Sequence, residues 1–424
     1  MKLLRTEFGL EDGLADTTTG GEMAERNDDL EIPEGADADD SFVCILDPAT
    51  GTGTFLVESI DVIHATMLAK WRAEGVRSEK GLLDRWNEYV PKHLLPRLHG
   101  YESMMAPYAV AHLKVGLKLL ETGYRFASEE RARVYLTNAL EPAQDHSGKF
   151  EFAIPALAHE AQAVNEIKCK QRFSVVVGNP PYLGEAGKGG EWIAGLMRGA
   201  DTTTGQNIAS YFEVDGHPLG ERNPKWINDD YVKFIRLSHH LLDTTGWGVH
   251  GLISNHGYLD NPTFRGVRHA LMTSFDRIHA LDLHGSLKKK ETPPQGGRDI
   301  NVFDIEQGVS IGLFSKTRSS CHDIHETTVR HADLWGERTA KYDWLMGHSL
   351  NKTDWTTVDA DKPFYLFEPL DRSEVGDYFE WPSINSVISV NGVGIVTARD
   401  HIVVDFESKP IRGSSVEISR FKYD

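Results

Sequence analysis

The sequence has few cysteines, no long apolar run and no segment at its start that resembles a signal peptide. Its three cysteines, Cys44, Cys169 and Cys321, lie far apart and form no CxxC pair, which argues against a disulfide scaffold or a cysteine-rich zinc site. No apolar run approaches the roughly 20 residues that span a bilayer, so we expect no integral membrane protein and no membrane partner. The first residues, MKLLRTEFGLEDG, lack the apolar core of a signal peptide, and we expect a reducing cytoplasmic location.

Positive charge is also in deficit. The chain of 424 residues has 45 Lys and Arg against 63 Asp and Glu, a net charge of −18. Residues 1–40 are the most acidic part, and we expect residues 16–40 to form a solvated loop or lead-in. Because charges are screened beyond about 8–10 Å, an acidic total does not forbid a local basic groove. Motifs must therefore decide whether DNA is a partner.

Strand-like and helix-like segments alternate from residue 41 to about residue 318. The apolar, strand-like segments are residues 41–46, 98–102, 133–138, 172–179, 248–254, 277–283 and 308–314. Amphipathic or apolar helical segments follow several of them, at about 54–67, 107–120, 229–243 and 263–275. This alternation predicts an α/β fold with a doubly wound, mostly parallel sheet. Beyond residue 318 the rhythm stops, and we expect a separate region there.

The first motif is DPATGTGTF, residues 47–55, between a predicted strand and a predicted helix. In an α/β sheet, ligands bind beyond the carboxyl ends of strands, where a glycine turn lets the backbone come close. A carboxylate at Asp47 suits the amino group of an amino-acid ligand better than it suits a phosphate. The turn lacks the third glycine of GxGxxG, and no GxxxxGK[ST] occurs. The alternative is a plain strand-to-helix turn.

The second motif is Asn179-Pro180-Pro181-Tyr182, directly after the apolar strand candidate. The Asn179 amide offers an acceptor and donors, and two consecutive prolines stiffen the turn. Acceptors from Asn179 and the Pro180 carbonyl would bind the two hydrogens of a planar amine, and Tyr182 offers a flat face for an aromatic base. The alternative is an ordinary Pro-Pro turn that ends a strand.

These two motifs, in this order, resemble the S-adenosylmethionine-dependent amino-methyltransferases that act on DNA adenine, in their gamma class. Further segments resemble the methyltransferase core of the single-chain restriction–modification enzymes called Type ISP and their Type IIG relatives. These segments are residues 98–117, 133–142, 229–238, 251–272, 281–291 and 301–314. The resemblance covers about residues 41–320 and, more weakly, 385–405. It implies a Rossmann-like methyltransferase fold.

The resemblance also implies roles for particular residues. Asp47, Gly51 and Gly53 would line the methionine side of the cofactor, together with Pro48, Ala49 and Phe55 of the same motif. Glu102 would hold the ribose hydroxyls, and Asn138 would contact the cofactor's adenine. Asn179, Pro180, Pro181 and Tyr182 would form the catalytic tetrad. The alternatives are that Glu102 is a surface acid and that Asn138 is a turn residue.

The sequence therefore predicts transfer of a methyl group from S-adenosylmethionine to the exocyclic amino group of adenine in double-stranded DNA, with no metal required for the transfer. Two alternatives stay open. The first is methylation of a glutamine side chain in a protein, since a planar amide amine also fits NPPY. The second is a non-catalytic DNA-recognition subunit of a restriction complex.

We expect three regions: an acidic lead-in with the remnant of an upstream helix in 1–40, the methyltransferase in 41–320, and a linker with the start of a target-recognition region in 321–424. The family carries a further cofactor motif upstream, and no segment resembles a helicase or nuclease. We therefore expect a core that was cut out of, or split from, a longer protein. Nuclease, helicase or specificity regions, on the same protein or on another chain, are expected partners besides DNA.

Four further features of the sequence are weaker evidence of function. The glycine-rich segment 184–190 either orders over DNA or is an inert flexible loop. Lys288 to Lys290, with Arg298 nearby, either neutralise phosphates or form a solvated face. Asn255-His256 lies at a predicted strand end, where a hydrogen-bonded structural histidine is the simpler interpretation. Cys321-His322 with His325 is too sparse to predict a metal site.

Overall fold

The computed structural model consists of two units, Met1–Leu370 and Asp371–Asp424. It describes residues 1–33, 35–126, 130–143, 155–182, 190–221, 224–289, 291–319, 324–370, 380–382 and 384–388. In the second unit the described residues include one short helix, α12 (Ile384–Val387). Most of the weakly matching segment 385–405 lies outside the described residues, as do 184–189, Lys290 and residues 320–323. No helix in the described ranges is long and apolar enough to cross a membrane.

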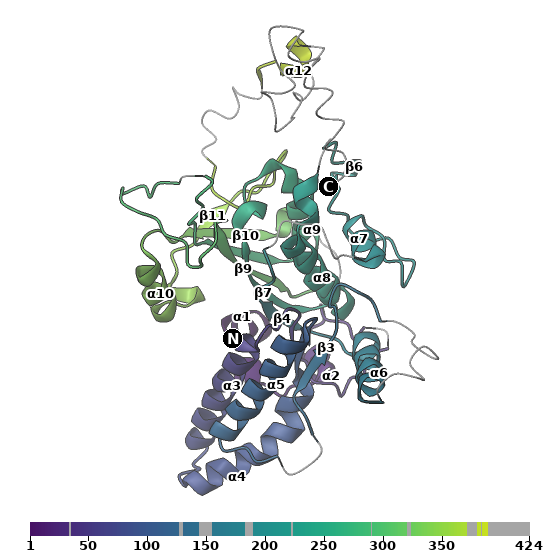
Figure 1. Cartoon of the computed structure of the whole chain (residues 1–424), viewed down its shortest axis with the longest axis vertical. Coiled ribbons are helices and arrows are strands. Elements are labelled where there is room, and N and C mark those ends of the chain that lie inside the picture. Colours follow the sequence, from purple (N-terminus) through teal and green to yellow (C-terminus); the bar gives the residue numbers. More distant parts are fainter. Residues whose placement is uncertain are drawn as a thin grey trace, which may run out of the picture. The chain divides into compact units, whose positions relative to one another are not determined.

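One large sheet organises the first unit (Figure 1). Its order is β11-β10-β8-β9-β7-β4-β1-β2-β3. The strands are β1 (Ile45–Asp47), β2 (Leu98–Glu102), β3 (Arg133–Leu136), β4 (Val175–Gly178), β7 (Gly248–Asn255), β8 (Arg277–Asp282), β9 (Val309–Lys316), β10 (Thr328–Asp333) and β11 (Thr356–Val358). Strands β3-β2-β1-β4-β7 are parallel neighbours, whereas β9 runs antiparallel between β7 and β8. The predicted doubly wound, mostly parallel α/β sheet is confirmed.

Helices cover both faces of this sheet. Ile45 and Val175 belong to one hydrophobic cluster with α3, α4 and α5, whereas Leu46 and Val176 belong to a second cluster with α8 and α9. Successive strand residues point to opposite faces, so a strand buried on both sides must be apolar throughout. The helices are α1 (Lys2–Phe8), α2 (Gly20–Arg26), α3 (Thr54–Ala73), α4 (Glu79–Tyr89), α5 (Met105–Glu121), α6 (Pro155–Lys170), α7 (Glu191–Met197), α8 (Asp230–Thr245), α9 (Arg265–Ser274) and α10 (Arg338–Gly347).

The first predicted strand is shorter in the structure than in the sequence analysis. Regular pairing starts at Ile45, although residues 42–44 are buried as expected. The Ser174 hydroxyl accepts a hydrogen bond from the Cys44 N–H and donates one to the Phe42 carbonyl. A side chain therefore replaces part of the strand ladder there, and periodicity alone does not reveal this.

The acidic segment 1–40 is more structured than its composition predicts. Leu4 and Phe8 of α1 and Met23 of α2 are buried in the cluster that contains α3. Helix α2 begins with a capping box, in which the Thr19 hydroxyl accepts from the Glu22 N–H and the Glu22 carboxylate accepts from the Thr19 N–H. A few well-spaced apolar side chains suffice to fix a segment whose average composition is polar.

The sheet also continues past residue 320, where the sequence shows no clear rhythm. Strand β10 pairs in parallel with β8 over six positions, and β11 pairs antiparallel with β10. Helix α10 packs through Trp344 and Leu345 on the cluster that holds Leu281 and Val302. The first unit extends to Leu370, and a recognition role for residues 321–424 stays a prediction.

Candidate active site

Four adjacent strands end with the polar residues that the sequence singled out. Asp47 ends β1 and Glu102 ends β2, whereas Asn138 follows β3 and Asn179 follows β4. Because β3, β2, β1 and β4 are parallel neighbours, all four residues lie at one edge of the sheet. The chain leaves β1 toward β2 and β3, and later leaves β4 toward β7, so the winding reverses between β1 and β4. Ligands of open α/β sheets bind in the crevice at such a switch point.

The glycine turn is tied to the second strand. The Gly51 N–H donates to Glu102 Oε2 at 2.9 Å, and the Met104 N–H donates to Glu102 Oε1 at 2.7 Å. Gly51 (φ 54°) and Gly53 (φ 83°) both have left-handed backbones. A Cβ atom on Gly53 would lie 3.2 Å from the backbone of Ala111, so the glycine also lets α5 approach closely. The hydrogen bond from Gly51 therefore fixes the Glu102 carboxylate next to the glycine turn.

Asp47 has a buried carboxylate, and one of its two oxygens has no hydrogen-bond partner among the described residues. Its side chain is 1% exposed, and Oδ1 accepts from the Ala49 N–H at 3.1 Å. Oδ2 is buried and has no hydrogen-bond partner among the described residues. Burial raises the pKa of Asp47 to about 7; the Ala49 hydrogen bond opposes this rise and the negative charge of Glu102 adds to it. An acceptor in this state fits an incoming donor or cation.

Strand β4 passes next to this carboxylate. A Cβ atom on Gly178 would lie 3.0 Å from Asp47 Oδ1, so the residue before Asn179 approaches Asp47 with its backbone. The carboxylate and the NPPY turn are therefore neighbours at the switch point. Phe55 lies in the first turn of α3, at the far end of the glycine turn, and Pro48 is buried beside Asp47.

The NPPY turn is held by a hydrogen bond within itself. The Tyr182 hydroxyl donates to Asn179 Oδ1, and burial raises the pKa of Tyr182, which keeps the hydroxyl protonated. Asn179 and Tyr182 are half-buried, Pro180 is buried and Pro181 is exposed. A carbonyl oxygen has two lone pairs, so Asn179 Oδ1 can accept a second donor.

A second aromatic residue faces this turn, and the sequence analysis did not assign it. The ring of Phe303, from the segment between β8 and β9, lies 6.4 Å from the Tyr182 ring between centroids, with the planes at 39°. Phe303 belongs to the segment 301–314 that resembles the family, but no local spacing links it to Tyr182. Only the sheet order brings the two rings together.

Asn138 is engaged by its own turn. Its Oδ1 accepts from the Leu140 N–H at 3.0 Å, and its Nδ2 donates to Glu141 Oε1 at 3.0 Å. The Lys168 ammonium donates to its backbone carbonyl at 2.7 Å. These contacts fit the turn residue of the alternative interpretation, and its contact with a cofactor stays a prediction.

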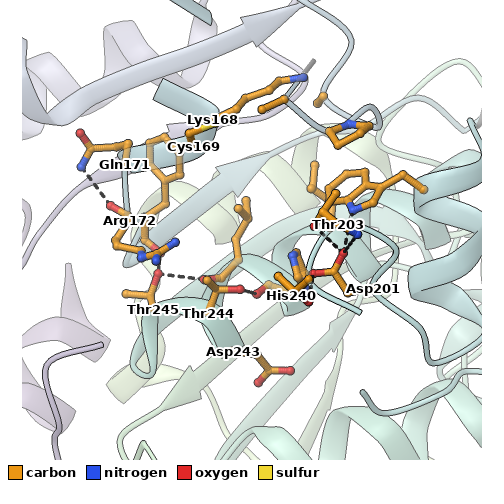
Figure 2. Close-up of a pocket in the computed structure, with 18 of the residues that line it drawn as sticks. Lys168, Cys169, Gln171, Arg172, Asp201, Thr203, His240, Asp243, Thr244 and Thr245 are labelled. Carbon is orange, nitrogen blue, oxygen red and sulfur yellow. Dashed lines mark hydrogen bonds between the residues drawn. The ribbon is translucent and has the colours of Figure 1, made fainter. Parts of the chain in front are cut away.

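One cavity in the described part of the chain lies elsewhere. A hollow of about 750 Å³ opens where β4 begins, between α6, α8 and the segment around Asp201 (Figure 2). Its polar groups are bound to one another; for example, Asp201 Oδ1 accepts from the Thr203 N–H at 2.9 Å and from the Trp192 ring N–H at 3.2 Å. None of the predicted site residues lines this cavity. Its volume is therefore no guide to the site at the carboxyl ends of the strands.

The chain resembles three solved structures, two of which are of Type ISP restriction–modification enzymes. It matches the ATP-dependent Type ISP enzyme LlaBIII bound to DNA with a TM-score of 0.60 and 20% identity, over 85% of this chain and 21% of that one. It matches the DrdV–DNA complex with a TM-score of 0.61 and 21% identity, over 99% of this chain and 36% of that one. It matches a nuclease-deletion mutant of the Type ISP enzyme LlaGI, in complex with a DNA substrate mimic, with a TM-score of 0.62 and 19% identity. This match covers 97% of this chain and 32% of that one.

These likenesses establish the fold. At this level of identity they do not carry function, because one fold hosts many activities. The chain spans about a third or less of the length of these three proteins. No protein-family model matches the sequence, and no curated protein does.

Proposed function

We propose that the chain transfers a methyl group from S-adenosylmethionine to the exocyclic amino group of adenine in DNA, as the modification part of a restriction–modification system. The observation that carries the proposal is the close approach of two groups at the switch point of the sheet. One is a buried carboxylate with an oxygen that has no hydrogen-bond partner among the described residues, and the other is the rigid Asn-Pro-Pro-Tyr turn. Two of the three structural neighbours are Type ISP restriction–modification enzymes, and all three structures include DNA or a DNA substrate mimic, which agrees with this proposal.

The residues around Asp47 fit such a cofactor. S-Adenosylmethionine supplies a methyl group on a positively charged sulfur, which is already activated for transfer. Asp47 Oδ2 would accept from the ammonium of its methionine part, because the oxygen is buried without a partner among the described residues. Glu102 already accepts two backbone N–H groups, and an ionised carboxylate has about four acceptor positions. It can therefore also accept from ribose hydroxyls.

The residues around Asn179 fit a flat base. Tyr182 and Phe303 are neighbouring aromatic rings, against which an extruded adenine would stack. Extrusion costs a few kcal/mol, and stacking offsets part of that cost. Asn179 Oδ1 and the Pro180 carbonyl would accept from the two hydrogens of the amino group and hold its nitrogen in line with the methyl donor. No step in this alignment uses a metal ion.

Asn179→Ala tests the proposal. We expect methyl transfer to duplex DNA to fall by about 100-fold or more, because alignment is lost, while S-adenosylmethionine binding stays within about 2-fold. Transfer is measured with tritiated cofactor and binding by equilibrium dialysis. The matched control is Asn351→Ala, which removes the same group from an exposed position. Retained transfer by Asn179→Ala would refute the role of the turn.

Two other functions are distinguished by the same assays. Methylation of a glutamine side chain would label protein and not duplex DNA, and it gives the aromatic pair Tyr182 and Phe303 no base to stack on. A recognition subunit without catalysis need not bind S-adenosylmethionine. Absence of cofactor binding by the unmodified chain, with DNA binding retained, would favour that subunit.

A further inference from the structure

A second polar cluster lies at the same edge of the sheet, beyond β7. His256 directly follows β7, Asp282 ends β8, and His284 comes two residues later. One ligand atom from each of these three residues can be chosen so that all lie within 4.8 Å of one another, and all three residues are buried. Two imidazoles and a carboxylate are the common ligand types for a zinc-like ion.

The two spacings to His284 Nδ1 fit a metal ion, whereas His256 Nδ1 is within hydrogen-bond distance of Asp282. His256 Nδ1 lies 3.0 Å from Asp282 Oδ2, and His284 Nδ1 lies 3.5 Å from that same oxygen. Glu291 Oε2 is 3.5 Å from His284 Nδ1 and adds a fourth group. Four ligands at about 2.0–2.2 Å around a tetrahedral ion are separated from each other by about 3.3–3.6 Å. By contrast, 3.5 Å is long for an N–H···O hydrogen bond, which is about 2.7–3.2 Å.

Two of these atoms lack hydrogen-bond partners. His284 Nδ1 and Glu291 Oε2 are buried, and neither atom makes a hydrogen bond within the described part of the chain. Water cannot easily replace the missing partner of His284, because this residue is only 6% exposed. The other ring nitrogen, Nε2, lies 2.8 Å from Asp333 Oδ1. A neutral His284 that donates from Nε2 to Asp333 has a lone pair at Nδ1. The lone pair would then face two carboxylates, an arrangement that a cation between them makes favourable.

The surroundings hold both rings in place. The His284 backbone has φ 51°, a left-handed conformation that is uncommon for a residue with a side chain. Its ring stacks on Trp335 with the planes 13° apart. The His256 ring lies against Gly308, where a Cβ atom would come within 2.3 Å of it. The histidines are therefore preoriented before any ion binds.

The nearby ammonium group of Lys289 does not occupy the position proposed for the ion. Lys289 pairs with Asp260 Oδ2 at 2.6 Å and lies 3.6 Å from Glu291 Oε1, the other oxygen of that carboxylate. Glu291 Oε2 thus stays directed to His284. The two ligands His284 and Glu291 belong to the segment 284–308 that also carries Phe303.

We propose that His256, Asp282 and His284 bind one divalent transition-metal ion of the zinc class, and that Glu291, next to His284, completes its coordination when the ion binds. The ion fixes the segment 284–308 against the ends of β7 and β8, and through it the ring of Phe303. The ion takes no part in the bond-making step of methyl transfer, so its binding can be tested without activity.

The test uses untagged full-length chain, stripped with a chelator and titrated with Zn²⁺ or Co²⁺ alone. We expect one ion per chain by calorimetry and by elemental analysis. With Co²⁺ we expect the intense visible absorption of a four-coordinate site. Zn²⁺ should raise the melting temperature, and chelation should increase proteolysis within 284–308. Asp282→Asn should weaken binding by about 100-fold or more and Glu291→Gln by about 10-fold.

Glu291→Gln is the decisive variant, because Gln keeps the size of the side chain and one acceptor oxygen, and Glu291 Oε2 has no hydrogen-bond partner among the described residues. His217→Gln, at an exposed histidine of β6 (His217–Pro218), is the matched control and should bind as the original chain does. The absence of stoichiometric binding would overturn the proposal and leave a charged His284 paired with the carboxylates. Binding unchanged by both Asp282→Asn and Glu291→Gln would overturn it too.

Discussion

The Tyr182 hydroxyl donates a hydrogen bond to Asn179 Oδ1, so two members of the NPPY turn are joined before any substrate is present. Both residues are half-buried at the end of β4. The bond fixes the direction of the amide oxygen that would receive the adenine amino group. A preoriented acceptor does not need to reorganise when the substrate arrives.

The first prediction separates this hydroxyl from the aromatic ring. Tyr182→Phe keeps the ring and removes the bond to Asn179, so we expect the rate of methyl transfer to fall by about 5-fold, since a typical hydrogen bond contributes about 1 kcal/mol. Cofactor binding should not change. Phe303→Leu keeps the hydroxyl and removes one stacking face, and should weaken extrusion of the base. Single-turnover label transfer and the fluorescence of 2-aminopurine at the target position measure the two effects.

An equal loss of extrusion in Tyr182→Phe and Phe303→Leu would contradict this division of roles. Phe126→Leu serves as a control for the loss of an aromatic ring outside the Tyr182–Phe303 pair, at an exposed position. It should leave the 2-aminopurine signal unchanged.

The second prediction concerns pH. Burial raises the pKa of Asp47 to about 7, so in the free protein this carboxyl is mostly neutral at pH 6 and mostly ionised at pH 8. Only the ionised form pairs with the ammonium of S-adenosylmethionine. We therefore expect affinity for the cofactor to rise with pH up to about 7 and to level off above it. Well below that pH, affinity should fall by up to about 10-fold for each pH unit. Calorimetry between pH 5 and pH 8 measures this slope.

Asp47→Asn is the control for the pH effect. It should bind the cofactor weakly at every pH, with no slope between pH 5 and pH 8. A slope that persists in this variant would assign the titration to another group. Carbon-13 NMR of the aspartate carboxyls in the free protein provides a check that does not depend on binding.

The third prediction concerns the glycine turn. Gly53→Ala forces a left-handed residue with φ 83° and brings a Cβ atom to 3.2 Å from Ala111 on α5. We expect it to lower the free energy of unfolding by about 2–4 kcal/mol. Gly75→Ala is the matched control, because its φ is 98° and a Cβ atom there meets nothing within 4 Å. It should cost about 1–2 kcal/mol, from backbone strain alone.

Urea unfolding measures both glycine variants. The difference between them reports the close approach of α5 to the turn. Equal losses would mean that α5 moves away at little cost, and that the approach to Ala111 does not fix the turn.

By itself the sequence determined the local elements and the edge at which the motifs meet. Residues 98–102 were predicted as a strand and form β2, and the apolar stripe of Leu56, Ile60 and Ile63 is the buried face of α3. Both follow from hydrophobic periodicity, which is a local property of the chain. That Asp47 and Asn179 lie at one edge follows from parallel strands, whose carboxyl ends must point the same way.

The tertiary structure alone decided which distant residues meet. Phe303 faces Tyr182, and His284 lies beside His256, because β9 inserts between β7 and β8 and the segment before it folds back over the strand ends. Strand β10 joins the sheet beyond residue 320 through its pairing with β8. No periodicity encodes such neighbours, because the order of strands is fixed by the packing of the whole sheet between its helices.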